Sequence, residues 1–74
     1  MNATAATLGI FVNDRPHALA GSATLCALMR ELGLAERRGV AAAVNGAVVA
    51  RANWEARELA EGDRVLVIRA TQGG

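Results

Sequence analysis

The spacing of apolar residues along the chain alternates between strand and helix periods. Residues 8–12 predict a strand in which Phe11 lies on one face and the other large side chains lie on the opposite face. Residues 64–69 are apolar on both faces, as expected of a central strand. Between them, residues 25–32 repeat leucine and methionine at the i, i+3, i+4, i+7 spacing of an amphipathic helix. The pattern therefore predicts one helix between strands.

Turn residues separate these segments and complete the order of elements. Asn13–Pro16 predicts a turn into a short edge strand at 17–20, where the missing N–H of a proline does little harm. Asn45–Gly46 favours the positive φ angles of a type I′ turn, which predicts a hairpin of residues 41–44 and 47–50.

Capping residues set the expected limits of the helix. Thr24 is the predicted N-cap, with Ser22 as the alternative, and Gly33 stands where a left-handed residue ends a helix. After the hairpin, Trp54 lies in a short irregular or helical-turn segment, and residues 61–63 form a turn before the last strand.

This order predicts an α+β fold, a mixed sheet of four to five strands with one main helix on one face. The last strand is expected beside the first, within a domain of residues 7–69 between a disordered extension (1–6) and a flexible tail (70–74). One helix covers one face, so the other keeps Phe11 and either Val65 with Val67 or Leu66 with Ile68. We expect an exposed apolar patch there, typical of a partner contact, unless loops or the Trp54 segment cover it.

Composition limits the size of the core. The chain of 74 residues is 53% apolar, but 17 of those residues are alanine and 22 are larger. That number suffices for one small core and not for the walls of a deep substrate cavity as well. We therefore expect a protein that is not an enzyme and binds no cofactor of its own.

Charge and cysteine content exclude further classes. The net charge of +1 and the pI near 8.0 lack the strongly basic character of nucleic-acid-binding domains. No apolar stretch is long enough to span a membrane, and we expect a cytoplasmic protein. Cys26 and His17 are the only soft metal ligands, so no metal site is expected. Cys26 is interpreted as an inert packed residue and His17 as a solvated edge residue.

The C-terminus is the one segment with a chemical role. The chain ends in Gly73 and Gly74, and a tail without bulky side chains can thread a narrow channel. Five extended residues reach about 16 to 18 Å. The reactive group would be the α-carboxylate of Gly74, a poor electrophile until another protein activates it. Such a tail suits a carrier.

These features together resemble the β-grasp, ubiquitin-like sulfur carriers, and among them the ThiS-type carriers of thiamine biosynthesis. The motifs that carry the resemblance are Val12-Asn13-Asp14, the helix stripe from Leu25 to Leu32, Val44-Asn45-Gly46, Val49-x-Arg51-x-x-Trp54, Leu59-x-x-Gly62-Asp63-x-Val65 and Gly73-Gly74. The resemblance covers residues 8–74. The chain departs from the family in its longer N-terminus and in the polar Thr71-Gln72 before the glycine pair.

The resemblance implies a mechanism and partners. An E1-like adenylyltransferase would use ATP and Mg²⁺ to activate Gly74, with Gly73 needed for access to its channel. A cysteine desulfurase persulfide would supply the sulfur of a Gly74 thiocarboxylate, which would donate it to thiazole synthase. The candidate docking residues are Phe11, Arg51, Trp54, Leu66 and Ile68, although Trp54 is equally consistent with a core position.

Three other functions remain open from the sequence. The molybdopterin-synthase carrier shares the expected fold and tail, and the Arg51-x-x-Trp54 element distinguishes it best. A ubiquitin-like modifier would join Gly74 to lysines of other proteins. The absence of lysine in this chain excludes chains of the modifier on itself but not attachment to targets. A plain β-grasp binding module would carry the glycine pair by accident.

Overall fold

The computed structural model describes residues 7–20 and 23–69. The strands and helices are β1 (Thr7–Val12), β2 (Arg15–Ala20), α1 (Leu25–Glu31), β3 (Val40–Val44), β4 (Ala47–Val49), the 3₁₀ helix η1 (Arg51–Asn53) and β5 (Arg64–Arg69). The five strands form one mixed sheet in the order β2-β1-β5-β3-β4. This confirms the predicted α+β fold and the central position of the last strand. The predicted extension (1–6), the tail (70–74) and Ser22 lie outside the described residues.

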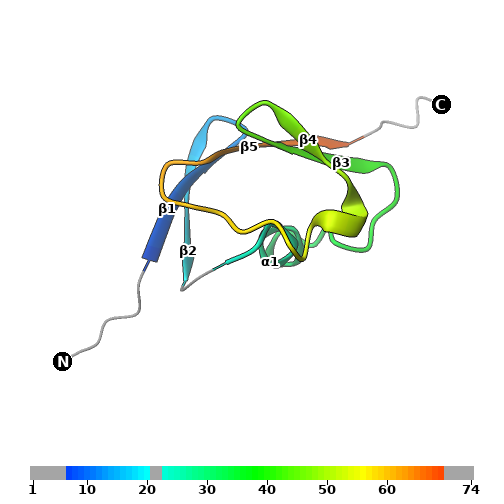
Figure 1. Cartoon of the computed structure of the whole chain (residues 1–74), viewed down its shortest axis with the longest axis horizontal. Coiled ribbons are helices and arrows are strands. Elements are labelled where there is room, and N and C mark those ends of the chain that lie inside the picture. Colours follow the sequence, from blue (N-terminus) through cyan, green and yellow to red (C-terminus); the bar gives the residue numbers. More distant parts are fainter. Residues whose placement is uncertain (1–6, 21–22, 70–74) are drawn as a thin grey trace.

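The order of strands places β5 between the two hairpins. β5 runs parallel to β1 and antiparallel to β3, so the first and last strands lie side by side at the centre of the sheet. Figure 1 shows α1 on one side of the sheet and the segment between η1 and β5 on that same side. The core therefore lies between the sheet, α1 and this connecting segment.

The core consists of apolar side chains from every one of these parts. Its members are Ile10, Leu19, Ala23, Leu25, Leu28, Met29, Ala42, Val44, Trp54, Leu59 and Val65. The helix stripe behaves as predicted, since Leu25, Leu28 and Met29 are fully buried. Alternation in the strands selects the buried positions, because successive side chains of a strand point to opposite faces of the sheet.

The first turn of α1 is closed by hydrogen bonds to Thr24 and to the connecting segment. The Thr24 Oγ1 accepts from the Ala27 N–H at 3.1 Å, which confirms the predicted N-cap. The N–H groups of Leu25 and Cys26 donate to the carbonyls of Arg57 and Trp54 at 2.8 and 3.0 Å. These bonds satisfy N–H groups that have no partner within the helix, and they hold the connecting segment against it.

The largest difference from the predicted boundaries is in β2. The strand begins at Arg15 and not at His17, so Pro16 lies inside it, opposite Phe11. An edge strand has one side without a partner, and a proline is tolerated there. The two-residue turn at Asn13 and Asp14, both with positive φ (52° and 70°), allows the longer pairing.

Candidate functional site

The end of β5 fixes the point from which the C-terminal tail begins. Arg69, the last residue of the strand, pairs with Val40 at the start of β3. The candidate site residues Gly73 and Gly74 lie outside the described residues. Five residues lie between Arg69 and the end of the printed sequence, and a fully extended segment of five residues spans at most about 18 Å. We call the place where β5 ends, defined by Arg69 and Val40, the tail root.

Two asparagine turns hold β5 in place. The Asn13 Oδ1 accepts from the Val67 N–H at 2.8 Å, beyond the point where β1 ends at Val12. The Asn45 Oδ1 accepts from the Arg64 N–H at 2.9 Å, and its Nδ2 donates to Asp63. Both asparagines have φ of 52°, a conformation that asparagine tolerates better than most residues. The side chains thus extend the pairing of the strand that leads to the tail root.

The face of the sheet opposite α1 carries an apolar patch. Leu66 and Ile68 alternate with core residues of β5 and are 51% and 45% exposed. Val48 of β4, which is 74% exposed, belongs to the same face because both it and Leu66 pair with Ala43. We call Phe11, Val48, Leu66 and Ile68 the open face. The sequence left open which pair of β5 residues is exposed, and it did not indicate Val48.

Phe11 marks one end of the open face. It is half-buried and lies opposite Arg64 in the β1–β5 pairing, with the guanidinium carbon 5.3 Å from the ring centre. A cation in this position is attracted by the ring and covers part of it. A shallow hollow of about 450 Å³ begins at Arg64 and runs between Val48 and Leu66. The described residues therefore leave an apolar depression, since the connecting segment packs on the α1 side.

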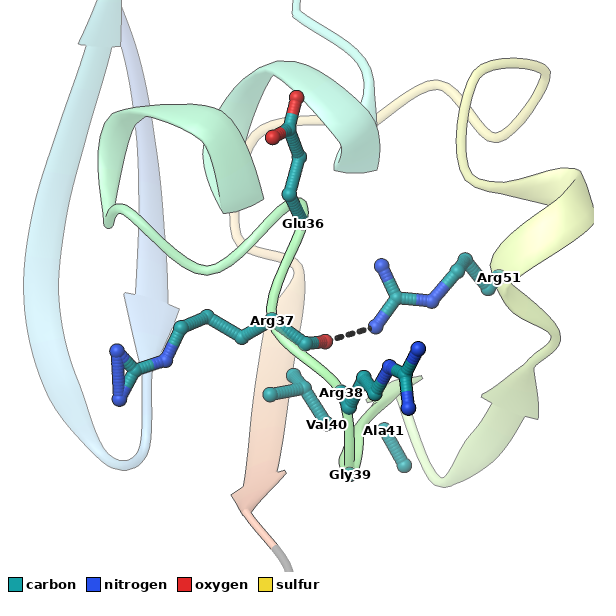
Figure 2. Close-up of a pocket in the computed structure, with 7 residues that line it drawn as sticks. All are labelled: Glu36, Arg37, Arg38, Gly39, Val40, Ala41 and Arg51. Atoms are coloured by element: carbon teal, nitrogen blue, oxygen red, sulfur yellow. Dashed lines mark hydrogen bonds between the residues drawn. The ribbon is translucent and has the colours of Figure 1, made fainter.

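Arg51 ties the loop between α1 and β3 to the start of the connecting segment. Its guanidinium donates to the carbonyl oxygens of Ala35 and Arg37, and Figure 2 shows the bond to Arg37. The guanidinium carbon also lies 4.6 Å from the centre of the Trp54 ring. The planar fork of an arginine suits such a pair of acceptors. Arg51 therefore uses its donors inside the molecule, which the sequence spacing did not indicate.

Trp54 occupies the core and not the surface. It is 2% exposed, and its Nε1–H donates to the Val49 carbonyl at 2.9 Å. Of the two alternatives that the sequence left open, the core position is the one observed. The Arg51-x-x-Trp54 element thus packs the connecting segment against the rest of the domain, and we do not include Trp54 in a docking surface.

The described residues contain no group of His, Cys, Asp and Glu that could hold a metal ion.

His17 differs from its predicted solvated position. It is half-buried, and its Nε2 lies 3.4 Å from the Glu31 Oε2 at the end of α1. The edge strand turns this residue toward the helix because it pairs with the core residue Ile10.

In the same described part of the chain, no helix is long and apolar enough to cross a membrane.

Comparison with protein families identifies the family of the chain. A model described as the ThiS family matches residues 10–74, which include the glycine pair at the C-terminus. No curated protein matches the chain.

Comparison with solved structures gives the same family. The chain is similar to the crystal structure of the thiamine biosynthesis protein ThiS from Geobacter metallireducens, at 28% identity and a TM-score of 0.76. The match covers 90% of this chain and 100% of that one. An NMR solution structure of a thiamine biosynthesis protein from the same organism matches at 28% identity, with a TM-score of 0.73 and coverage of 90% and 88%.

Proposed function

Because the chain belongs to the ThiS family, whose members are sulfur carriers of thiamine biosynthesis and not enzymes, we propose that Gly74 carries sulfur as a thiocarboxylate and donates it to thiazole synthase. The observation that carries this proposal is the family match over residues 10–74, because it extends through both terminal glycines. The fold agrees, since β5 leads to the tail from the centre of the sheet.

The proposed mechanism assigns the chemistry to partner enzymes in the cytoplasm. An E1-like adenylyltransferase uses ATP and Mg²⁺ to convert the Gly74 carboxylate into an acyl-adenylate, which makes its carbonyl carbon electrophilic. The outer sulfur of a cysteine desulfurase persulfide then displaces AMP and forms an acyl disulfide. A second thiol cleaves its S–S bond, which leaves the sulfur on Gly74 and joins the two thiol sulfurs in a disulfide. Sulfur is a softer and stronger nucleophile than carboxylate oxygen, so the resulting thiocarboxylate attacks a carbonyl-bearing intermediate in thiazole synthase. Gly73 supplies the backbone freedom that the entry channel requires.

The direct test is the mass of the C-terminal fragment. We expect protein incubated with the adenylyltransferase, ATP, Mg²⁺, cysteine and the desulfurase to gain the mass of one oxygen-to-sulfur exchange on Gly74. Fragmentation must locate the change, because oxidation of Met29 adds nearly the same mass. Omission of ATP is the control. A Gly74 that keeps its ordinary carboxylate in the complete mixture would contradict the proposal, and an isopeptide bond to a lysine of another protein would indicate a modifier.

We further propose that the adenylyltransferase binds the open face. Exposed apolar side chains beside a hollow are typical anchors of a protein interface, and the patch lies on the strand that leads to the tail. We expect Leu66→Ser and Ile68→Ser each to weaken binding of the enzyme by about 10- to 100-fold, which corresponds to about 1.4 to 2.8 kcal/mol. Isothermal titration calorimetry of the full chain with the enzyme measures this loss.

Ala18→Ser is the matched control for the docking test. Ala18 is exposed on the same side of the sheet, but on the edge strand β2, where it pairs with Gly9. We expect this variant to bind as tightly as the unchanged protein. Equal weakening by Ala18→Ser, or undiminished binding of the Leu66 and Ile68 variants, would place the interface elsewhere.

A further inference from the structure

The net charge of the chain is small, but its positive and negative side chains are unevenly distributed over the domain. Four of its eight arginines lie around the tail root with one carboxylate, that of Glu36, whereas the other four share the remaining residues with six carboxylates. The four arginines at the tail root are Arg37, Arg38, Arg51 and Arg69, which we call the arginine cluster. The tail root therefore carries a net charge of +3, and the rest of the domain carries −2.

Position in the fold places the four arginines around the tail root, although Figure 2 shows the Arg37 side chain on the side of the loop opposite those of Arg38 and Arg51. Arg37, Arg38 and Arg51 line one hollow with Val40 and Ala41. Arg69 joins them because it pairs with Val40 in the sheet. In Figure 2 the Glu36 carboxylate points away from Arg38 and Arg51. Within residues 7–20 and 23–69, no carboxylate forms an ion pair with any arginine of the cluster.

The loop that carries Arg37 and Arg38 is held before any partner binds. Arg51 donates to two of its carbonyl groups, and the Leu34 N–H donates to the Met29 carbonyl at 2.8 Å. The side chains of Arg37 and Arg38 remain exposed. A loop that is ordered in advance lowers the entropic cost of forming an interface.

We infer that the arginine cluster docks on an acidic rim around the channel that receives the tail; this inference rests on the proposed function. An enzyme that reaches Gly74 must enclose the tail, which spans at most about 18 Å, so the mouth of its channel comes against the tail root. Complementary carboxylates at the rim orient the carrier and accelerate the encounter.

A protein surface fits the cluster better than a nucleic acid does. Single-stranded nucleic acid is bound by basic grooves with exposed aromatic rings on which bases stack. In the described part of the chain, Trp54 has the only aromatic ring near the cluster, and that ring is buried. The exposed guanidinium groups of Arg37 and Arg38 are planar forks of donors, which match carboxylate geometry.

The test is the rate of association between the full chain and the E1-like adenylyltransferase of its own cell. We expect Arg37→Glu and Arg38→Glu each to slow association by about 3- to 10-fold at ~50 mM salt, with the difference disappearing near ~0.5 M salt, where exposed charges are screened. Arg15→Glu, on the edge strand β2, is the matched control because it changes the net charge equally from an exposed position. We expect it to slow association less than about twofold.

The outcomes separate this inference from the proposed function. Loading of sulfur on Gly74 of the unchanged protein is measured in parallel, so a failure of loading contradicts the proposed function itself. If loading occurs and the Arg37 and Arg38 variants associate as fast as the unchanged protein, the inference is wrong. Equal slowing by Arg15→Glu would also overturn it, as would binding of a single-stranded oligonucleotide that depends on Arg37 and Arg38. Unchanged unfolding midpoints of the three variants exclude an effect of misfolding.

Discussion

Deletion of Gly74 should abolish sulfur loading while leaving the folded domain and its docking surface intact. The shortened chain ends in the carboxylate of Gly73, which lies about 3.5 Å short of the position that the activating enzyme requires. A misplacement of about 1 Å can reduce a rate about 100-fold, so we expect at least this loss in ATP-dependent pyrophosphate exchange. Binding of the enzyme should change little, because the open face is retained.

Two variants separate the reach of the tail from the nature of its end. Deletion of Gln72 keeps the Gly73-Gly74 end but shortens the tail equally, so we expect a comparable loss of exchange. Gly74→Ala keeps the length and adds one methyl group beside the reacting carboxylate, so the fit in the channel alone is changed. Normal exchange by the Gly74 deletion would show that the glycine pair is accidental, as expected of a plain binding module.

Much of the fold follows from local patterns in the sequence. The Asn45–Gly46 turn, the Thr24 cap and the helix stripe each depend on neighbouring residues, and each is confirmed. The position of His17 was not predictable in this way. It faces the core side because β2 pairs it with Ile10, and Glu31 comes within 3.4 Å of its Nε2 only in the folded domain.

The candidate site likewise contains residues whose position the sequence predicts and residues whose position depends on the folded domain. Alternation in residues 64–69 predicts that Leu66 and Ile68 share a face, but only the packing of the connecting segment decides that this face is open. Val48 lies in a strand of three residues, where a period of two carries little information. The partners of Arg51 are backbone carbonyls, which every residue possesses, so no sequence motif indicates them.

Replacement of Trp54 should have the largest effect on stability. Trp54→Ala removes a buried ring from the core, and such substitutions cost about 3 to 5 kcal/mol. The change also removes the Nε1–H donor of the Val49 carbonyl and the ring beneath Arg51. In a domain of this size, a loss of about 3 kcal/mol lowers the melting temperature by roughly 12 to 24 °C. Thermal unfolding followed by circular dichroism measures the shift.

Trp54→Phe and Leu66→Ser are the controls, and together they identify the role of the tryptophan. The phenylalanine keeps much of the apolar volume but leaves the Val49 carbonyl without its donor, so we expect a loss of about 1 to 2 kcal/mol. Leu66→Ser, at an exposed position, should change stability by less than about 0.5 kcal/mol while weakening enzyme binding. The opposite pattern for Trp54→Ala, a stable domain that binds the enzyme poorly, would show that the ring leaves the core to serve as an anchor. Trp54→Ala should lose both stability and enzyme binding, whereas Trp54→Phe should keep tight binding. This pattern would establish that Trp54 supports docking only by stabilising the fold.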